Sequence, residues 1–374
     1  MNSSALDRLA EFCQEHRLSS ALLSNPATIT WLTGYAPPIQ TGPNPFEGGP
    51  ALAWWLDGRL TLLISDGEAG AARGQGVDAC EYVAYTIEGP AAGFENQGAV
   101  LGGLLHSAHG TKGLVGVELN FLPAPFLQVL KDALPQVTIT PLDGSFDLLR
   151  AVKTPEEIKR IRAALSICDL AQAETSRLMR PGMSEIELWG QVKAGMESAA
   201  GGRLPVLADF LGGPRTAEIG GLPGSYVLRE GDPLIADIVP RRDGYWGDNS
   251  GTHFIGEPVA ELKRAWRVVR ETLRAGVAAV RPGVRACDLD AQMRKAVQDA
   301  GYAPYPHHSG HGLGATYHEE PRIVPYNTQA LQAGMVIALE PGIYMPDVGG
   351  VRLEDVVLVT QDGCDVLTRH LTDS

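Results

Sequence analysis

Two acidic residues stand inside stretches of the chain that are otherwise apolar. Asp237 interrupts the run 233–240 and Glu340 interrupts the run 335–344. Both runs have the composition and the Gly or Pro boundaries that are typical of buried strands. An ionised carboxylate in such a place costs several kcal/mol unless a positive group meets it. We therefore expect a cation, and with it a functional site, at both positions.

Each of these acids has a second acidic residue further along the chain. Asp248 follows Asp237 by 11 residues across a predicted turn, and Glu354 follows Glu340 by 14 residues. His311 lies between the two pairs, in Gly-His-Gly-Leu-Gly. Four carboxylates and one imidazole that converge from strands would make a site for two divalent cations.

Some of these residues also allow an interpretation without a metal. Asp248 could be an ordinary loop acid, and His311 could be an ordinary loop histidine. Glu354 could be an exposed strand residue that pairs with Arg352. All of these interpretations would have to hold at once, and they would leave the two acids of the apolar runs buried without a partner.

Length, composition and charge limit the classes of protein to consider. At 374 residues the chain is long for one core, so two domains are expected. The net charge of −13 argues against nucleic acid and anionic membranes as partners. Five cysteines without a CxxC motif predict reduced thiols and a cytoplasmic location. No signal peptide and no apolar run of about 18 residues is recognised, so neither secretion nor membrane insertion is expected.

The pattern of elements changes near residue 150, which predicts domains at 1–149 and 150–374. The first part carries a clear hairpin signal at 51–65, where two apolar runs flank Asp57-Gly58. A helix and three further strands are also expected there, at 4–17, 19–24, 115–119 and 137–141. This part contains neither GxGxxG nor a P-loop, so we expect the chemistry in the second part.

The second part of the chain repeats a helical motif. Residues 154–157, Thr-Pro-Glu-Glu, form a capping box that opens a long amphipathic helix ending near residue 179. Arg-Pro-Gly occurs at 180–182 and again at 281–283, each time between two predicted helices and 101 residues apart. These matches predict a duplicated unit of two helices followed by strands, with one pair of acids in each copy.

These residues and four short stretches resemble the pita-bread metallopeptidases of the creatinase and prolidase group. The stretches are Gly-His-Gly-Leu-Gly (310–314), His-Glu-Glu-Pro (318–321), Glu-Pro-Gly-Ile-Tyr (340–344) and Gly-Gly-Val-Arg-Leu-Glu-Asp (349–355). The resemblance spans about 150–365 and extends more weakly to the N-terminus. The residues that match the metal ligands of the family in order and spacing are Asp237, Asp248, His311, Glu340 and Glu354.

The resemblance implies an α+β fold with two domains. The pita-bread catalytic domain would be a six-stranded curved sheet covered by two pseudo-symmetric helix pairs, and a smaller α/β domain would precede it. Methionine aminopeptidases usually lack the N-terminal domain, and creatinases do not keep the metal ligands, so both fit less well. The resemblance also implies a homodimer.

The resemblance further implies a hydrolase that uses two divalent ions. The oxygen-rich ligand set favours Mn²⁺, with Zn²⁺ or Co²⁺ as alternatives. The expected catalytic residues are Glu340, which is also a ligand, His318, and Arg352, which would orient a ligand carboxylate. Substrate binding is expected of His307, His318 and Arg322. His308 matches nothing in the family.

Short proline-containing peptides are the implied substrates, and Xaa-Pro dipeptides are favoured among them. Arg322 matches an arginine that some prolidases use to bind the C-terminal carboxylate of the substrate. It could instead be a surface arginine opposite Glu319 and Glu320. The alternatives are an Xaa-Pro aminopeptidase, a non-catalytic binding protein of the same fold, and a creatinase-like hydrolase. Gly220 stands where proline-specific members usually carry a histidine, which puts substrate binding in question.

Overall fold

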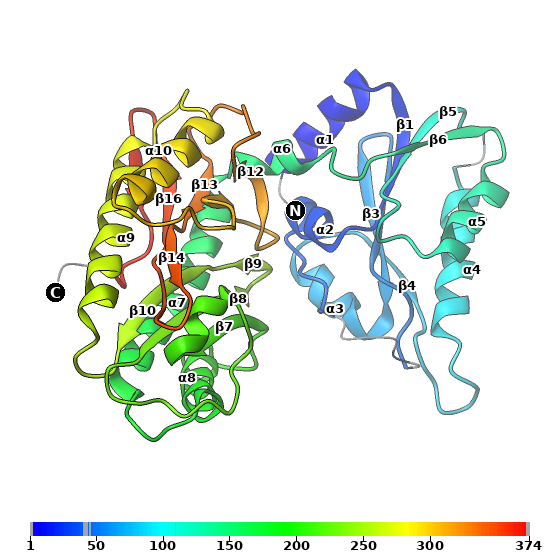
Figure 1. Ribbon diagram of the computed structural model, residues 1–374. Coiled ribbons are helices and arrows are strands. Elements are labelled where there is room, and N and C mark those ends of the chain that lie inside the picture. Colours follow the sequence, from blue (N-terminus) through cyan, green and yellow to red (C-terminus); the bar gives the residue numbers. More distant parts are fainter. Residues whose placement is uncertain (1–2, 40–43, 45, 109, 372–374) are drawn as a thin grey trace. The chain divides into compact units, whose positions relative to one another are not determined.

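The fold is seen in a computed structural model that describes all residues except 1–2, 40–43, 45, 109 and 372–374 (Figure 1). The chain forms two compact units, Met1–Leu149 and Arg150–Ser374. Each unit combines helices with β-strands, as the predicted α+β class requires: the first has one six-stranded sheet, and the second has sheets of four, five and two strands in place of the single six-stranded sheet expected.

The N-terminal unit is a six-stranded mixed sheet with helices on both faces. Its strands, in the order β4-β3-β2-β1-β5-β6, are β1 (Leu18–Leu23), β2 (Leu52–Leu56), β3 (Arg59–Ser65), β4 (Ala79–Tyr82), β5 (Gly113–Val117) and β6 (Val137–Pro141). Its helices are α1 (Ser3–Glu15), α2 (Pro26–Thr33), α3 (Asp66–Gly74), α4 (Gly93–His106) and α5 (Ala124–Ala133), and α6 (Asp147–Ala151) continues into the next unit. Helices α1 to α3 pack on one face of the sheet, and α4 and α5 pack on the other.

The predicted hairpin is confirmed. Strands β2 and β3 pair antiparallel, with Leu56 opposite Arg59. The two turn residues both have positive φ, 49° at Asp57 and 79° at Gly58, as a tight two-residue hairpin turn requires.

The second unit is the pita-bread fold. Its strands are β7 (Val206–Gly212), β8 (Pro233–Arg242), β9 (Tyr245–Trp246), β10 (Asn249–Phe254), β11 (Gly310–Gly312), β12 (Glu319–Ile323), β13 (Val336–Leu339), β14 (Gly342–Met345), β15 (Gly349–Arg352), β16 (Asp355–Val359) and β17 (Cys364–Val366). Its helices are α7 (Pro155–Leu178), α8 (Glu185–Ala200), α9 (Ala260–Ala279) and α10 (Ala286–Asp299), with a short 3₁₀ helix at Gly213–Glu218. Helices α7 and α8 share a core with β7 and β8, whereas α9 and α10 share one with β13, β15 and β16.

Equivalent hydrogen bonds in the two halves support the predicted duplication. The backbone N–H of Gly182 donates to Leu228 O at 2.9 Å, and that of Gly283 donates to Leu331 O at the same distance. The two glycines have φ of 90° and 88°, a left-handed conformation that most side chains avoid. Each Arg-Pro-Gly turn therefore ties its helix pair to the segment that precedes the central strand of its own half, β8 or β13.

The predicted capping box is also present. Thr154 Oγ1 accepts from Glu157 N at 3.3 Å, and Thr154 N donates to Glu157 Oε2 at 2.9 Å. Ser184 and Glu187 form the same arrangement at the start of α8. These caps satisfy backbone N–H groups that a helix leaves without partners at its N-terminus.

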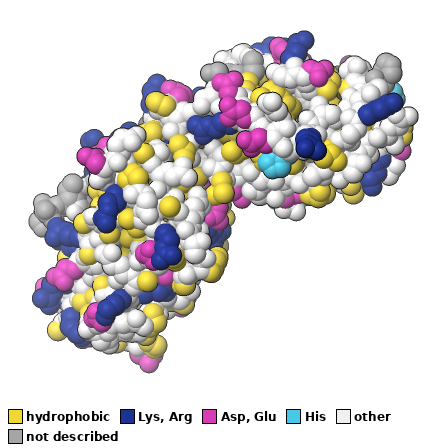
Figure 2. Space-filling view, turned by 90° about the horizontal axis from the view of Figure 1, so that it is seen from above, with side chains coloured by type: hydrophobic (Ala, Val, Ile, Leu, Met, Phe, Trp, Pro, Cys, Tyr) yellow, Lys and Arg dark blue, Asp and Glu magenta, His cyan; other side chains and the backbone are white. Residues whose placement is uncertain are grey.

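The surface has a mixed character on the face that Figure 2 shows. Basic and acidic side chains lie interspersed there, with hydrophobic side chains between them. Among the helices of the described residues, none is long and apolar enough to cross a membrane.

The close contact between β11 and β13 leads to a prediction about stability. A Cβ atom on Gly310 would lie 2.0 Å from Ala338 O, and a backbone atom cannot move aside as a side chain can. We expect Gly310→Ala to lower the free energy of unfolding by at least the ~1–3 kcal/mol typical of overpacking. The control Gly190→Ala, in α8 with open space around the glycine, should instead raise stability by up to ~1 kcal/mol. Thermal denaturation of both variants checks this, and equal melting temperatures would contradict it.

Candidate metal centre

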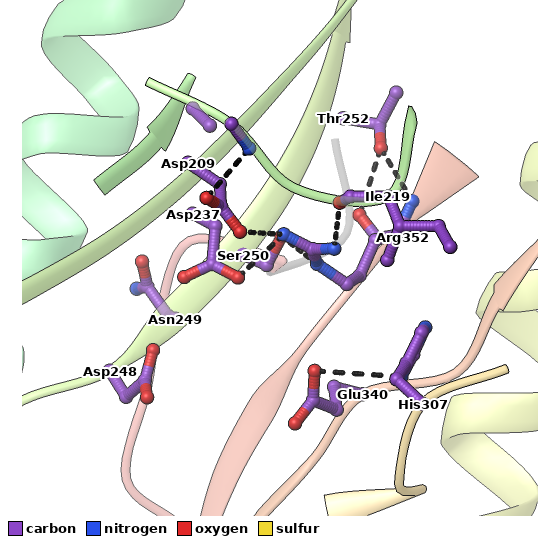
Figure 3. A network of polar contacts seen from close by, with 12 residues as sticks. Asp209, Ile219, Asp237, Asp248, Asn249, Ser250, Thr252, His307, Glu340 and Arg352 are labelled. Atoms are coloured by element: carbon purple, nitrogen blue, oxygen red, sulfur yellow. Dashed lines mark hydrogen bonds and ion pairs between the residues drawn. The ribbon is translucent and has the colours of Figure 1, made fainter. Parts of the chain in front are cut away.

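Separate strands bring the five predicted metal ligands together. Asp237 lies in the middle of β8 and His311 in the middle of β11, while Glu340 follows β13 directly. Asp248 lies between β9 and β10, and Glu354 lies between β15 and β16. Figure 3 shows the carboxylates of Asp237, Asp248 and Glu340 around a common space. Because pairing within the sheets fixes these strands, the positions of the carboxylates are fixed as well.

His311 directs one ring nitrogen at the acids. Its Nε2 lies 3.6 Å from Asp248 Oδ2 and 3.5 Å from Glu340 Oε1. Its Nδ1 lies 2.9 Å from Gly312 O and donates to it when the proton is on that nitrogen. Such a bond leaves the lone pair of Nε2 free for a cation. Asp248, His311 and Glu354 each offer a ligand atom, and these atoms lie within 4.8 Å of one another.

Two buried carboxylate oxygens of this set lack a hydrogen-bond partner. Asp248 is 4% exposed and Glu354 is 1% exposed. Asp248 Oδ1 and Glu354 Oε1 accept no hydrogen bond from the part of the chain that the structure describes. A buried acceptor without a partner is costly, and a charged one more so. This donor set fits a divalent cation, which would satisfy both oxygens.

Three of the carboxyl groups have raised pKa values. Burial raises the pKa of Asp237 from 3.8 to about 6, although the nearby Arg352 guanidinium opposes this rise. Burial, and then the neighbouring acids, raise the pKa of Asp248 and of Glu354 well above the usual range. These groups titrate as a set. In the absence of cations, these three carboxyl groups hold protons up to a higher pH than usual. Bound cations would displace those protons.

Glu340 differs from the other three acids because histidines surround it. Burial raises its pKa, but a hydrogen bond from His308 and the nearby His311 outweigh this and hold the pKa at about 2. His308 Nε2 lies 2.8 Å from Glu340 Oε1. Of the four acids, Glu340 therefore keeps its charge down to the lowest pH.

Arg352 lies next to Asp237 (Figure 3). Its Nη2 donates to Asp237 Oδ2 at 2.8 Å and to Asp209 Oδ2 at 3.3 Å. Its Nη1 donates to Ile219 O at 2.5 Å and to Tyr344 Oη at 3.2 Å. A guanidinium bound at so many points holds the carboxylate of Asp237 in one orientation.

The carboxylate of Asp209 lies beside Gly220, the position at which proline-specific members of the family usually carry a histidine. Asp209 pairs with Asp237 across β7 and β8, and its side chain is 39% exposed. A Cβ atom on Gly220 would lie 2.6 Å from Asp209 Oδ2. The Asp209 carboxylate therefore takes space that a side chain at position 220 would need. Sequence analysis missed Asp209 because the strand register that brings it to Asp237 cannot be read from the sequence.

The ligands open into a cavity of about 380 Å³ with a partly apolar wall. Its lining residues are Trp189, Val206, Leu207, Ala208, Asp209, Leu222, Pro223, Asp237, Val239, Asp248, His311, Tyr317, His318, Glu340 and Glu354. All five predicted ligands and His318 are among them, whereas His307, Arg322 and Arg352 are not.

His318 lies at the cavity just before β12. Burial, and then the nearby His311 and His308, lower its pKa to about 3, so the imidazole is neutral at neutral pH. The next residue, Glu319, is buried and forms ion pairs with Lys153 and Arg150. This buried ion-pair network anchors the segment that carries His318.

His307 and Arg322 lie outside the cavity wall. His307 Nε2 lies 2.9 Å from Tyr344 Oη, and His307 Nδ1 lies 3.9 Å from Glu340 Oε2. The Arg322 guanidinium forms no ion pair with a carboxylate among the described residues, and Glu319 is paired with other cations. Burial and the nearby histidines are the larger causes of the low pKa of His318, and the charge of Arg322 lowers this pKa further. The guanidinium is therefore close enough to act on the site electrostatically.

Comparisons with known proteins agree with this geometry. Residues 159–361 match the model of metallopeptidase family M24, and residues 6–152 match the creatinase/prolidase N-terminal domain. The putative dipeptidase YkvY of Bacillus subtilis is 28% identical over 98% of this chain and 98% of its own. The prolidase of Pyrococcus horikoshii has a TM-score of 0.83 at 25% identity over 98% of both chains. The X-Pro aminopeptidase of Thermotoga maritima has the same fold, with a TM-score of 0.82 at 23% identity over 97% of both chains. The chain belongs to metallopeptidase family M24.

Proposed function

We propose that this chain is a peptidase that uses two divalent ions to hydrolyse the Xaa-Pro bond of short peptides, above all of dipeptides. One observation carries the proposal: five ligand side chains converge at a cavity, and two of their buried oxygens lack partners. The ligands we propose are Asp237, Asp248, His311, Glu340 and Glu354. We favour Mn²⁺ because oxygen atoms dominate this set, with Zn²⁺ or Co²⁺ as alternatives.

The side chains around this centre have complementary roles in the proposal. Two bound divalent ions would supply a nucleophilic hydroxide at neutral pH and stabilise the developing oxyanion. Glu340, which keeps its charge, accepts the proton of the attacking water and later returns it to the leaving nitrogen. The neutral His318 donates a hydrogen bond to the tetrahedral intermediate. Arg352 holds the carboxylate of Asp237 in place.

The choice of dipeptides depends on the relatives and on Arg322. The Pyrococcus horikoshii relative is a prolidase, and YkvY is named a putative dipeptidase. A guanidinium without a carboxylate partner among the described residues is suited to the free carboxylate of a C-terminal proline. Substrate binding by His307 remains a prediction, because its ring lies against Tyr344 and Glu340 outside the cavity wall. A cytoplasmic location and a homodimer remain predictions.

Metal removal should change stability in a pH-dependent way. The raised pKa of Asp237 means that the metal-free fold is favoured by protonation, and this contribution is lost as the pH rises through about 6. Mn²⁺ replaces those protons and stabilises the folded state. We therefore expect Mn²⁺ to raise the melting temperature more at pH 7.5 than at pH 5, when each is compared with a chelated sample.

Two variants make this stability test specific to the site. Asp248→Ala should abolish most of the gain from Mn²⁺ and lose at least one ion and nearly all activity. The control Asp243→Asn, on an exposed turn after β8, should keep both ions and the activity. Full activity in a verified metal-free sample would contradict the proposed centre.

His318→Ala should separate catalysis from metal binding. The variant loaded with Mn²⁺ should keep two ions by elemental analysis, because His318 is no ligand in the proposed centre. Its kcat should fall by about 10²-fold or more, as when a donor to an oxyanion is removed. A folded variant that lost both Mn²⁺ ions would show that His318 is a ligand instead.

Arg322→Ala tests the preference for dipeptides. An ion pair with the substrate carboxylate is worth about 1.5–3 kcal/mol, or roughly ten- to a hundred-fold in kcat/KM. The wild type should cleave Xaa-Pro faster than Xaa-Pro-Xaa, and amidation of the dipeptide C-terminus should harm the wild type much more than Arg322→Ala. The control Arg203→Ala, at an exposed position, should behave like the wild type. Faster cleavage of the tripeptide would favour the aminopeptidase alternative.

A further inference from the structure

Three histidines face one another on the Glu340 side of the cavity. The ring of His308 lies 5.3 Å from that of His311 and 5.1 Å from that of His318, measured between centroids, and the rings of His311 and His318 lie 4.2 Å apart. Each ring offers a nitrogen, and the three ligand atoms lie within 4.8 Å of one another. His308 has no assigned role in the proposed peptidase.

A carboxylate oxygen lies beside this group. Glu340 Oε1 lies 2.8 Å from His308 Nε2 and 3.5 Å from His311 Nε2. Ligand atoms about 2.0–2.2 Å from a tetrahedral ion lie about 3.3–3.6 Å from one another, whereas the three ring nitrogens lie within 4.8 Å of one another. The group therefore needs only small side-chain movements to surround an ion.

The donor atoms of this group differ in chemistry from those of the carboxylate-rich centre. Three imidazoles with an open fourth position suit Zn²⁺, and they also suit Cu²⁺ and Ni²⁺. Mn²⁺ is the weakest binder of the divalent first-row series and prefers oxygen. We propose that His308, His311 and His318 form a second, nitrogen-rich site that binds a zinc-class ion.

The two sites share His311, and this sharing gives the second site a regulatory effect. His311 Nδ1 faces Gly312 O, so only Nε2 is directed at the cavity. One nitrogen binds one ion, so zinc in the trihistidine site withdraws His311 from the carboxylate-rich centre, whose two ions then keep only their carboxylate ligands. It also occupies His318. Zinc in excess therefore inhibits the Mn²⁺-loaded protein.

His308 could instead serve only as a hydrogen-bond donor to Glu340, and two variants separate these roles. His308→Gln keeps an N–H donor but provides no imidazole, and His308→Ala removes both. His16→Ala, at an exposed position in the N-terminal unit, is the control. All variants are compared as full-length, tag-free protein, with Mn²⁺ content and circular dichroism as checks of folding.

Zinc stoichiometry and Co²⁺ spectra test the proposal without a substrate. The wild type and His16→Ala should bind three Zn²⁺ ions per chain at saturation but only two Mn²⁺ ions. Both His308 variants should bind two ions of either metal. If a third Zn²⁺ still binds to a His308 variant, its affinity should be at least about 10–100-fold lower than in the wild type. A loss of this size is typical even when the changed residue only supports a metal ligand. Co²⁺ should give intense tetrahedral absorption bands in the wild type that His308→Gln lacks.

Equal zinc stoichiometry and affinity in the wild type and both His308 variants would overturn the proposal. Retention of the third Zn²⁺ in His308→Gln alone would also overturn it, because His308 would then act only through its hydrogen bond. Failure of the proposed peptidase is a separate outcome: it would appear as absent Mn²⁺ binding or absent cleavage of Xaa-Pro peptides. The third zinc ion is counted independently of both.

Discussion

Repulsion among four carboxylates at one cavity wall is the constraint on which this structure depends. Asp237, Asp248, Glu340 and Glu354 arrive from separate strands, and three of them have raised pKa values because burial and their neighbours disfavour the charged form. Such repulsion would push flexible segments apart. Rigid strands must hold the acids close together when no cation compensates their charge. The site therefore requires a scaffold that is stable without bound cations.

The duplicated architecture supplies this scaffold. Each half places a buried strand, β8 or β13, between two neighbouring strands and covers it with its own helix pair. Close backbone approach adds rigidity where His311 is held, because Cβ atoms on Gly310 and Gly312 would lie 2.0 and 2.2 Å from backbone oxygens. Within each half, the strands that carry the candidate ligands therefore cannot separate without breaking their own sheet.

The candidate ligands could be predicted from the sequence because acids inside apolar strands are uncommon, and their spacing around His311 resembles that of a known family. Sequence analysis could not find Asp209, whose role depends on strand register, or the ion pair between Lys153 and Glu319, which are 166 residues apart. It also assigned substrate binding to His307 and no role to His308. Neighbouring residues of an extended chain point to opposite sides, and only the structure shows that His308 faces Glu340 while His307 faces Tyr344.

Charge balance also limits how this site can hold a substrate. Two divalent ions would neutralise the four ligand carboxylates, and Arg352 would then remain paired with Asp209. The floor of the cavity would carry no net charge, and the position of the family histidine is filled by Asp209 and Gly220. Binding energy must therefore come from the cavity wall, which is apolar around Trp189 and Leu207, and from groups at its edge. In the proposed peptidase, the cavity wall together with Arg322, more than the metal centre, would therefore set the specificity.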